Sequence, residues 1–174
     1  AGDRQLGVFG CTAAHLMYSV DHPSLPSELW RRARVGSGHP GKAVQAQSQE
    51  GGLERQLSTL NPWWRDRAPI DAQPVEFEVP DGLGGTERIE GWLLRAKGSR
   101  QPQPVLNDVH GGPASYALLG YDTNVFWQVL CARGWAVLAL NAVGSASYGR
   151  KFCRRLAGRW GSCDLPQHLA ALAE

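Results

Sequence analysis

The sequence lacks the marks of a membrane protein or a nucleic-acid-binding protein. Its formal net charge is only +2, and its basic residues are scattered, with Arg31-Arg32 and Arg154-Arg155 as the only Arg-Arg pairs. Nucleic-acid binding needs clustered positive charge, so no nucleic-acid partner is expected. No apolar run approaches the roughly 18 residues that span a bilayer, and the amino terminus has no basic segment followed by an apolar one. No membrane association is therefore expected.

Cysteine is also sparse, and its spacing excludes the common metal-binding patterns. Cys11, Cys131, Cys153 and Cys163 form no Cys-x-x-Cys pair. Cys131 lies in a predicted helix, where we expect a small core residue. A Cys153–Cys163 disulfide stays open, and a reducing cytoplasm is the expected location. We expect no metal and no organic cofactor.

What the sequence does contain is a strand that runs directly into two adjacent glycines. Val105, Leu106 and Val109 are apolar and partly β-branched, which predicts a short, mostly buried strand. His110-Gly111-Gly112-Pro113 follows it. Glycines at the carboxyl end of a strand give the backbone unusual φ values and leave bare N–H groups open to a ligand.

The residues after this turn predict alternating helices and strands. Thr123 to Arg133 has Val125, Phe126, Val129 and Leu130 at helical spacing, and Gly134 suits the helix C′ position. Trp135 to Leu140 is a continuous apolar run, as in a strand covered on both faces. A loop over 141–149 and helices over 151–157 and 167–173 complete a βα pattern, which is typical of a parallel sheet.

The residues before the turn predict antiparallel structure. Four short extended segments are expected at Leu6–Phe9, His15–Val20, Glu28–Arg32 and Leu53–Leu57. Residues 36–52, rich in Gly, Gln and Ser, are expected to form a mobile loop before the last of them. This spacing suits a propeller blade, and an ordinary antiparallel meander stays open as the alternative.

Two further segments lead into the second half of the chain. In Asn61-Pro-Trp-Trp64, Pro62 suits the first position of a helix capped by Asn61, and the tryptophans are expected to pack between domains. Pro74–Val79 and Ile89–Leu94 alternate apolar and polar residues around a glycine-rich turn, which predicts a hairpin. The domain boundary is expected near residues 68–73.

Four motifs then occur in order along the chain: Val109-His-Gly-Gly-Pro113, Ala132-Arg-Gly-Trp-Ala-Val-Leu138, Gly144-Ser-Ala-Ser-Tyr-Gly149, and Trp160-Gly161 followed by Asp164. Together they resemble the start of the catalytic domain of the prolyl oligopeptidase family, which includes acylaminoacyl peptidases and dipeptidyl aminopeptidases. The resemblance implies an α/β class. Residues 1–70 would be the end of a β-propeller with its linker, and residues 71–174 the first part of an α/β-hydrolase sheet.

The resemblance also implies a serine peptidase that cleaves short peptides through an acyl-enzyme. The nucleophile elbow of such folds reads Gly-x-Ser-x-Gly, and this motif is absent here. The triad is therefore expected beyond Glu174, in a longer protein of which this chain is a piece. We expect the isolated chain to be inactive.

By the same resemblance, the chain carries the oxyanion side of the site. The N–H groups of Gly111 or Gly112 would face the substrate carbonyl oxygen, and His110 takes a position where some relatives have a tyrosine. His110 as a turn residue bonded to the local backbone is the alternative. Tyr148 would line the pocket or pack under its loop. His15, His22, His39 and His168 have no partners at metal or triad spacing and are assigned surface or packing roles.

Three residues near these motifs also need an explanation. Val143 stands where the family usually has arginine, which removes a charged group near the site. Asn107 and Asp108 are polar within an otherwise apolar strand, and Asn107 would need a buried partner.

Other functions stay open. The same fold serves esterases and lipases, and a degenerate homologue would be a non-catalytic binding module. The expected partner is a peptide substrate, and a homo-oligomer of the full-length protein also stays open.

Overall fold

The computed structural model describes residues 5–33, 54–67, 70–100, 102–112, 114–117, 120–121 and 124–174. The chain forms two compact units, one of residues 1–67 with 119–122 and one of residues 68–118 with 123–174. Each unit is described by itself. Some predictions made above fall partly or wholly outside the described residues. They are the loop over 36–52, His39, Leu53 at the start of the fourth extended segment, the start of the domain boundary at residues 68 and 69, Pro113 of the glycine motif, and Thr123 at the start of the predicted helix.

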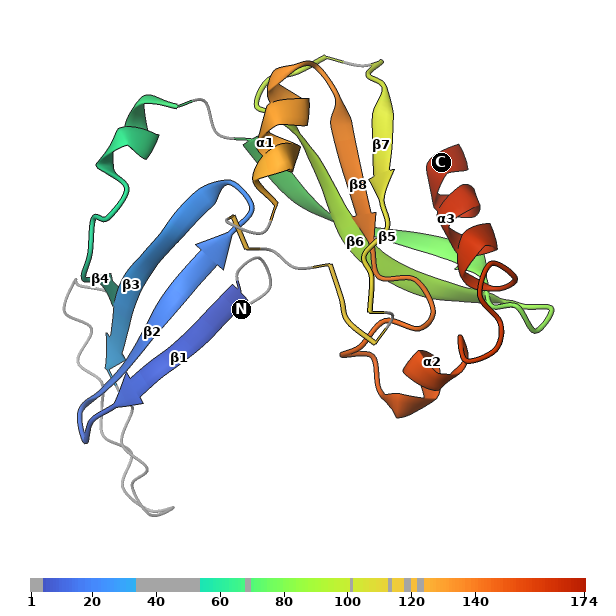
Figure 1. The fold of residues 1–174 in the computed structure, drawn as a ribbon, viewed down its shortest axis with the longest axis horizontal. Coiled ribbons are helices and arrows are strands. Elements are labelled where there is room, and N and C mark those ends of the chain that lie inside the picture. Colours follow the sequence, from blue (N-terminus) through green and yellow to red (C-terminus); the bar gives the residue numbers. More distant parts are fainter. Residues whose placement is uncertain are drawn as a thin grey trace, which may run out of the picture. The chain divides into compact units, whose positions relative to one another are not determined.

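The first unit is a four-stranded antiparallel sheet (Figure 1). Its strands are β1 (Gln5–Cys11), β2 (His15–His22), β3 (Leu25–Ala33) and β4 (Glu54–Gln56), in the order β1-β2-β3-β4. The four predicted extended segments are confirmed. A 3-10 helix, η1 (Pro62–Asp66), follows the sheet.

The second unit is built on a mixed sheet. Its strands are β5 (Ile70–Pro80), β6 (Thr86–Ala96), β7 (Val105–Asp108) and β8 (Ala136–Leu140), in the order β5-β6-β8-β7. β5 and β6 form the predicted antiparallel hairpin, and β8 pairs antiparallel with β6. β7 and β8 are parallel, as the βα pattern predicted.

Three α-helices accompany this sheet: α1 (Val125–Ala132), α2 (Arg150–Arg154) and α3 (Asp164–Ala173). α1 ends as predicted at Gly134, whose φ is +85°. The N–H of Gly134 donates to the Cys131 carbonyl and the N–H of Trp135 to the Leu130 carbonyl, both at 3.1 Å. These two bonds form a Schellman motif, which stops the helix and leads the chain directly into β8.

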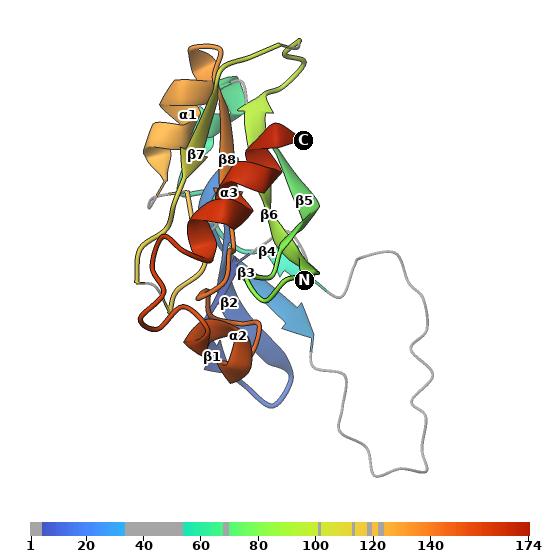
Figure 2. The ribbon, with the colours of Figure 1, turned by 90° about the vertical axis from the view of Figure 1, so that its right-hand side faces the viewer.

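α1 and α3 cover opposite faces of the mixed sheet (Figures 1 and 2). The two-residue period of β7 shows this, because neighbouring side chains in a strand point to opposite faces. Asn107 Nδ2 lies 3.0 Å from His168 Nδ1 on α3, whereas Asp108 accepts a 2.7 Å hydrogen bond from the Trp127 indole on α1. The two polar residues that the apolar strand pattern left unexplained therefore each meet one helix.

The core lies between the sheet and α3, and all five residues of β8 are buried. Val79, Ile89, Leu138, Leu140 and Ala171 form one apolar cluster. Burying a large aliphatic side chain contributes about 1.5–3 kcal/mol, so this cluster supplies much of the stability of the unit. A strand in the middle of the sheet that is covered on both faces has to be apolar along its whole length, as the sequence of β8 is.

One prediction of burial is wrong. β7 was expected to be mostly buried, but it is the outer strand of the sheet in the described residues, and Val105 is 45% exposed. In α1, Cys131 is buried as predicted, and Trp127 is buried as well, because the bond from its indole to Asp108 turns that side of the helix towards the sheet. The residues at helical spacing, Val125, Phe126 and Val129, are exposed.

The prediction that the Asn61 side chain caps a helix is also wrong. Pro62 does begin a helix, but it is a 3-10 helix and the Asn61 side chain makes no capping bond. The Asn61 amide donates instead to the carbonyl of Ser27, at 3.3 Å. The side chain therefore fastens the start of η1 to β3.

Gly91 gives a test of how closely β6 and β8 are packed. A Cβ at this position would lie 2.5 Å from the Ala139 carbonyl oxygen and 2.7 Å from Leu140 Cδ2. We expect Gly91→Ala to lower the free energy of unfolding by about 1–3 kcal/mol, since the backbone of a central strand would have to move. Urea denaturation followed by circular dichroism measures the change.

Gly111→Ala is the matched control, because nothing lies within 4 Å of a Cβ at that position. It should change the free energy of unfolding by less than about 1 kcal/mol. Equal stability of the two variants would show that the packing at Gly91 is looser than described.

Candidate functional site

The glycine turn, residues 110–112, directly follows the carboxyl end of β7. Gly111 and Gly112 are both exposed, and Gly112 has a φ of +133°, a value that side chains disfavour. A Cβ on Gly111 would meet nothing within 4 Å, and no residue in the described part of the chain accepts a hydrogen bond from either glycine N–H. Two backbone donors are therefore accessible at this edge of the sheet.

A second loop, residues 141–149, follows the carboxyl end of β8 and supports the glycine turn. Two hydrogen bonds connect this loop to the residues that follow the glycine turn: the Ala146 N–H donates to the Ser115 carbonyl at 2.6 Å, and the Ala117 N–H donates to the side-chain Oδ1 of Asn141 at 2.7 Å. The loop itself is tightly coiled, with φ values of +104° at Gly144 and +73° at Ser147. A non-glycine residue in this conformation is strained and needs its surroundings to hold it.

His110 adds a side-chain connection between the same two segments. Its Nε2 lies 2.9 Å from Ser145 Oγ, and its Nδ1 lies 3.1 Å from the carbonyl oxygen of Gly111. Ser145 is only 2% exposed and its hydroxyl also lies 2.7 Å from the Ala142 carbonyl oxygen. A buried serine bonded in this way is not placed as a nucleophile, because its hydroxyl is occupied and closed to substrate.

Beneath the loop lies a buried polar hub centred on Gln167. This fully buried side chain accepts a 2.7 Å hydrogen bond from the Val143 N–H and donates to the Pro80 carbonyl and to Glu87. Glu87 in turn pairs with both terminal nitrogens of Arg155, each at 2.7 Å. The pairing with Glu87 is the main cause that raises the pKa of Arg155. A charge-assisted pair with two parallel hydrogen bonds fixes both the distance and the relative orientation of the two side chains.

Val143 is buried with Leu156 and Cys163 in a small apolar cluster. It also lines a small hollow together with His110. The residue that departs from the family pattern is therefore a packing residue in this chain.

Tyr148 lies at the outer end of the loop. Its hydroxyl donates to Glu90 at 3.0 Å and accepts a 3.1 Å hydrogen bond from the Asn141 amide. Burial, with a further contribution from Glu90, raises the pKa of Tyr148 to about 12. Because Asn141 also receives the Ala117 N–H, Tyr148 stabilises the group that positions the chain after the glycine turn.

His168 is buried under the same edge of the sheet. Asn107 Nδ2 is a donor, so the His168 Nδ1 that faces it carries no proton. Burial lowers the pKa of His168, the nearby His110 adds to this, and Asp164 opposes it. Geometry and electrostatics thus agree on a neutral imidazole. Asn107 has a partner at its Nδ2, whereas its Oδ1 is buried without a hydrogen-bond partner among the described residues.

The predicted site residues thus come together only in part. His110, Ser145, Trp160 and Asp164 line a small hollow of about 50 Å³. Gly111, Gly112 and Tyr148, which were also predicted as site residues, are not among its lining residues. Three residues that sequence reasoning missed hold this region: Asn141, Ser145 and Gln167. The polar Asn141 directly after an apolar strand was one available signal. Ser145 lies in the Gly144–Gly149 motif, but nothing there indicated its contact with His110, and nothing in the sequence marked Gln167.

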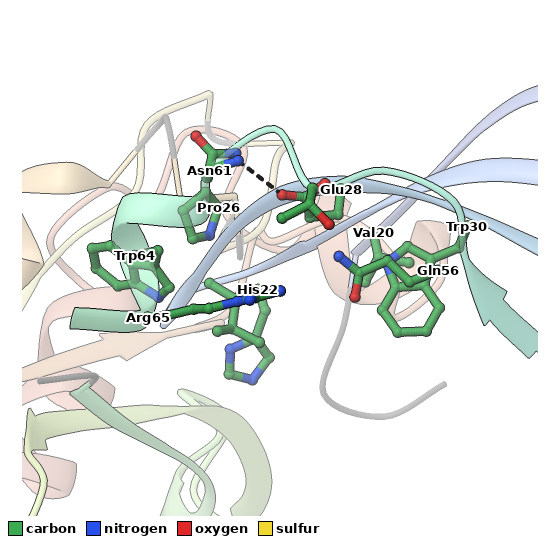
Figure 3. Close-up of a pocket in the computed structure, with 11 residues that line it drawn as sticks. Val20, His22, Pro26, Glu28, Trp30, Gln56, Asn61, Trp64 and Arg65 are labelled. Atoms are coloured by element: carbon green, nitrogen blue, oxygen red, sulfur yellow. Dashed lines mark hydrogen bonds between the residues drawn. The ribbon is translucent and has the colours of Figure 1, made fainter. Parts of the chain in front are cut away.

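The first unit has a larger cavity of about 380 Å³, which the sequence did not predict. Figure 3 shows Trp30 and Gln56 on one side of it and Trp64 on the other, with Arg65 reaching towards His22. Its volume lies within the range of small-molecule sites. Trp64 is fixed by a 2.9 Å bond from its indole to the Ser24 carbonyl and by an edge-on contact with Tyr121, with ring centroids 4.9 Å apart.

Glu28 borders the cavity, but its carboxylate is already occupied. It accepts hydrogen bonds from the Ser58 hydroxyl and from the N–H groups of Leu60 and Asn61. Burial alone would raise its pKa, and these donors together lower it. Glu28 therefore anchors the turn before η1 and leaves little capacity to bind a cation.

Other site types find no support within the described residues. Groups of three or more His, Cys, Asp or Glu side chains suited to a metal ion do not occur there. The four cysteines are free thiols, and burial raises the pKa of Cys131 to about 11. None of the helices described is long and apolar enough to cross a membrane.

Comparison with known proteins finds relatives of this chain in sequence and in structure. The uncharacterized peptidase YuxL of Bacillus subtilis is 27% identical over 163 residues, which are 92% of this chain and 22% of that protein. Dipeptidyl-peptidase 4 of Giardia intestinalis is 32% identical over 95 residues, 53% of this chain and 12% of that protein. The uncomplexed acylaminoacyl peptidase of Pyrococcus horikoshii matches 99% of this chain with a TM-score of 0.71 at 22% identity.

These relatives are peptidases of the prolyl oligopeptidase family. The predicted resemblance is therefore confirmed. The chain spans less than a quarter of the length of these relatives, 22% of the Bacillus protein and 24% of the Pyrococcus chain. No protein-family model matches it.

The network around Tyr148 predicts how stability depends on alkaline pH. An unfolded tyrosine loses its proton near pH 10.0, whereas Tyr148 keeps it until about 12. The stabilisation from this group is therefore complete below pH 10 and is lost as the pH rises towards 12. We expect urea midpoints to fall more between pH 9 and pH 11.5 in the wild type than in Tyr148→Phe.

Tyr116→Phe is the control for this measurement. Tyr116 is also partly exposed, and its substitution leaves the bonds of Tyr148 intact. It should keep the response of the wild type to pH. An identical response in Tyr148→Phe and the wild type would contradict the linkage.

Proposed function

We propose that this chain forms part of a serine peptidase of the prolyl oligopeptidase family. In this proposal the second unit is the start of the catalytic α/β-hydrolase sheet, and the first unit is the last blade of a preceding β-propeller. The substrates are short peptides, which are cleaved through an acyl-enzyme. The similarity to peptidases of this family, reported above, supports the proposal.

One observation carries the proposal. The glycine turn follows the carboxyl end of a strand in parallel pairing. Both glycines are exposed, and their N–H groups have no protein acceptor in the described chain. Ligands of open α/β sheets bind beyond the carboxyl ends of the strands. Unused backbone donors at this edge suit the negative charge that develops on a carbonyl oxygen during acyl transfer.

The role of this chain in the reaction would be electrostatic. A serine hydroxyl, supplied from outside these residues, would add to the peptide carbonyl carbon as a base takes its proton. The carbonyl oxygen would then carry negative charge, stabilised by hydrogen bonds from Gly111 or Gly112. As the oxygen returns to a carbonyl, the amine leaves with a proton and an ester remains on the serine. One such donor is worth about 3–4 kcal/mol of transition-state stabilisation.

The exposed apolar faces of α1 and α3 favour the proposal that the sheet is larger in the longer protein. Leu165, Leu169 and Leu172 form an exposed stripe along α3, and the exposed apolar face of α1 contains Val125, Phe126 and Val129. Apolar stripes of this kind mark surfaces that another element covers. Further strands beside β7, with their own helices, would cover them.

The two other functions differ in what they require. An esterase or lipase would use the same glycine turn, but it would give no reason for the antiparallel first unit. A non-catalytic binding module is favoured by the absence of a nucleophile elbow in this sequence. The two predictions below separate these functions from the peptidase.

The first prediction concerns the donor at position 111 in the longer protein. Gly111→Pro removes the N–H, and we expect kcat to fall by about 10²- to 10³-fold while KM stays close to the wild-type value. Hydrolysis of peptide anilides and of activated esters measures both constants and shows which substrate class is preferred.

Gly111→Ala is the matched control, because it keeps the N–H and its side chain would meet nothing within 4 Å. It should retain most of the activity. Full activity of Gly111→Pro, with a denaturation profile like that of the wild type, would exclude Gly111 as the donor.

The second prediction concerns the isolated 174-residue chain. Because it has no nucleophile elbow, we expect neither a burst of product nor turnover from peptide anilides or activated esters. Turnover by the purified chain that a serine-directed reagent abolishes would contradict the proposal.

A further inference from the structure

The hydrogen bonds of His110 cannot all form with a neutral imidazole. Three contacts meet at this side chain and its partner: Nδ1 with the Gly111 carbonyl at 3.1 Å, Nε2 with Ser145 Oγ at 2.9 Å, and Ser145 Oγ with the Ala142 carbonyl at 2.7 Å. Each contact needs one proton. A neutral imidazole and a hydroxyl supply two, because carbonyl oxygens only accept.

A protonated imidazole supplies the missing proton. Both ring nitrogens of His110 then donate, one to the Gly111 carbonyl and one to Ser145 Oγ, and the hydroxyl is free to donate to the Ala142 carbonyl. In the neutral state one contact has no proton and weakens. The charged state therefore keeps all three contacts, whereas the neutral state keeps two of them.

Two ionisable groups on α3 lie close to His110. Asp164 lines the same hollow, and His168 is electrostatically coupled to His110. Asp108, on the strand before the turn, has its carboxylate bonded to the Trp127 indole. The 142–145 segment of the loop contributes no charged side chain.

We propose that Ser145 is a positioning residue for the glycine turn, which it holds through the His110 imidazole, and that protonation of this imidazole tightens the hold. Ser145 suits this role because it is buried, and the strained 141–149 loop keeps its hydroxyl in place. The substrate carbonyl would meet an ordered pair of N–H groups while the imidazole is charged and a more mobile pair while it is neutral. The inference rests on the proposed function, in which the turn binds the oxyanion.

Nuclear magnetic resonance on the 174-residue chain tests the inference without any catalytic step. Backbone order parameters of Gly111 and Gly112 are measured between about pH 5 and 8, the range in which histidine changes its charge. In the wild type we expect values near the rigid limit of about 0.85 at low pH and lower values at high pH. In Ser145→Ala they should approach about 0.6 at every pH.

Two further variants keep the test decisive. Ser147→Ala changes an exposed serine of the same loop and should follow the wild type. His110→Gln retains a hydrogen-bonding side chain that does not titrate, so the order parameters of the glycines should lose their pH dependence. It changes a partly exposed residue and therefore serves if Ser145→Ala does not fold.

A folded Ser145→Ala with the glycine order parameters of the wild type would overturn the inference, as would a wild-type pH dependence in His110→Gln. A failure of the peptidase proposal is seen separately, as turnover by the isolated chain that a serine-directed reagent abolishes. The two results are independent, because order parameters do not depend on turnover.

Discussion

The parallel pairing of β7 with β8 determines where everything of functional interest lies in the second unit. The register joins Val105 to Ala136 and Asp108 to Ala139, so both strands end at the same edge of the sheet. The glycine turn and the 141–149 loop leave from that edge and meet, although more than 20 residues separate them in sequence. An antiparallel register would have placed them at opposite edges, and His110 would have had no contact with Ser145.

Buried polar side chains then fix the loops that this pairing brings together. Gln167 satisfies the Val143 N–H and the Pro80 carbonyl at once, so it joins the loop after β8 to the hairpin between β5 and β6. Leaving such buried groups unpaired costs about 1–3 kcal/mol each, which makes alternative loop positions unfavourable. The positions of the loops at the site therefore depend on buried hydrogen bonds, because apolar packing alone would not determine them.

The sequence predicted the parts of the fold that local patterns determine. Period-two alternation located the hairpin, an unbroken apolar run located β8, and Gly134 located the end of α1. The sequence was a poor guide to which side of an element faces inward. That depends on partners far along the chain, as with the bond from Trp127 to Asp108, and on the position of β7 at the edge of the sheet. For the site, the glycine turn was visible, whereas Ser145 lies 35 residues from His110 and no local pattern indicated their contact.

The outer edge of β7 has a practical consequence for handling the chain. In the described residues β7 pairs with β8 alone, so one row of its N–H and C=O groups faces outward. An open strand edge is a template for pairing with another chain, and this one has exposed apolar residues on the neighbouring helices. Copies of the isolated chain should therefore self-associate edge to edge as concentration rises, and a lysine introduced at the partly exposed Val105 would improve solubility.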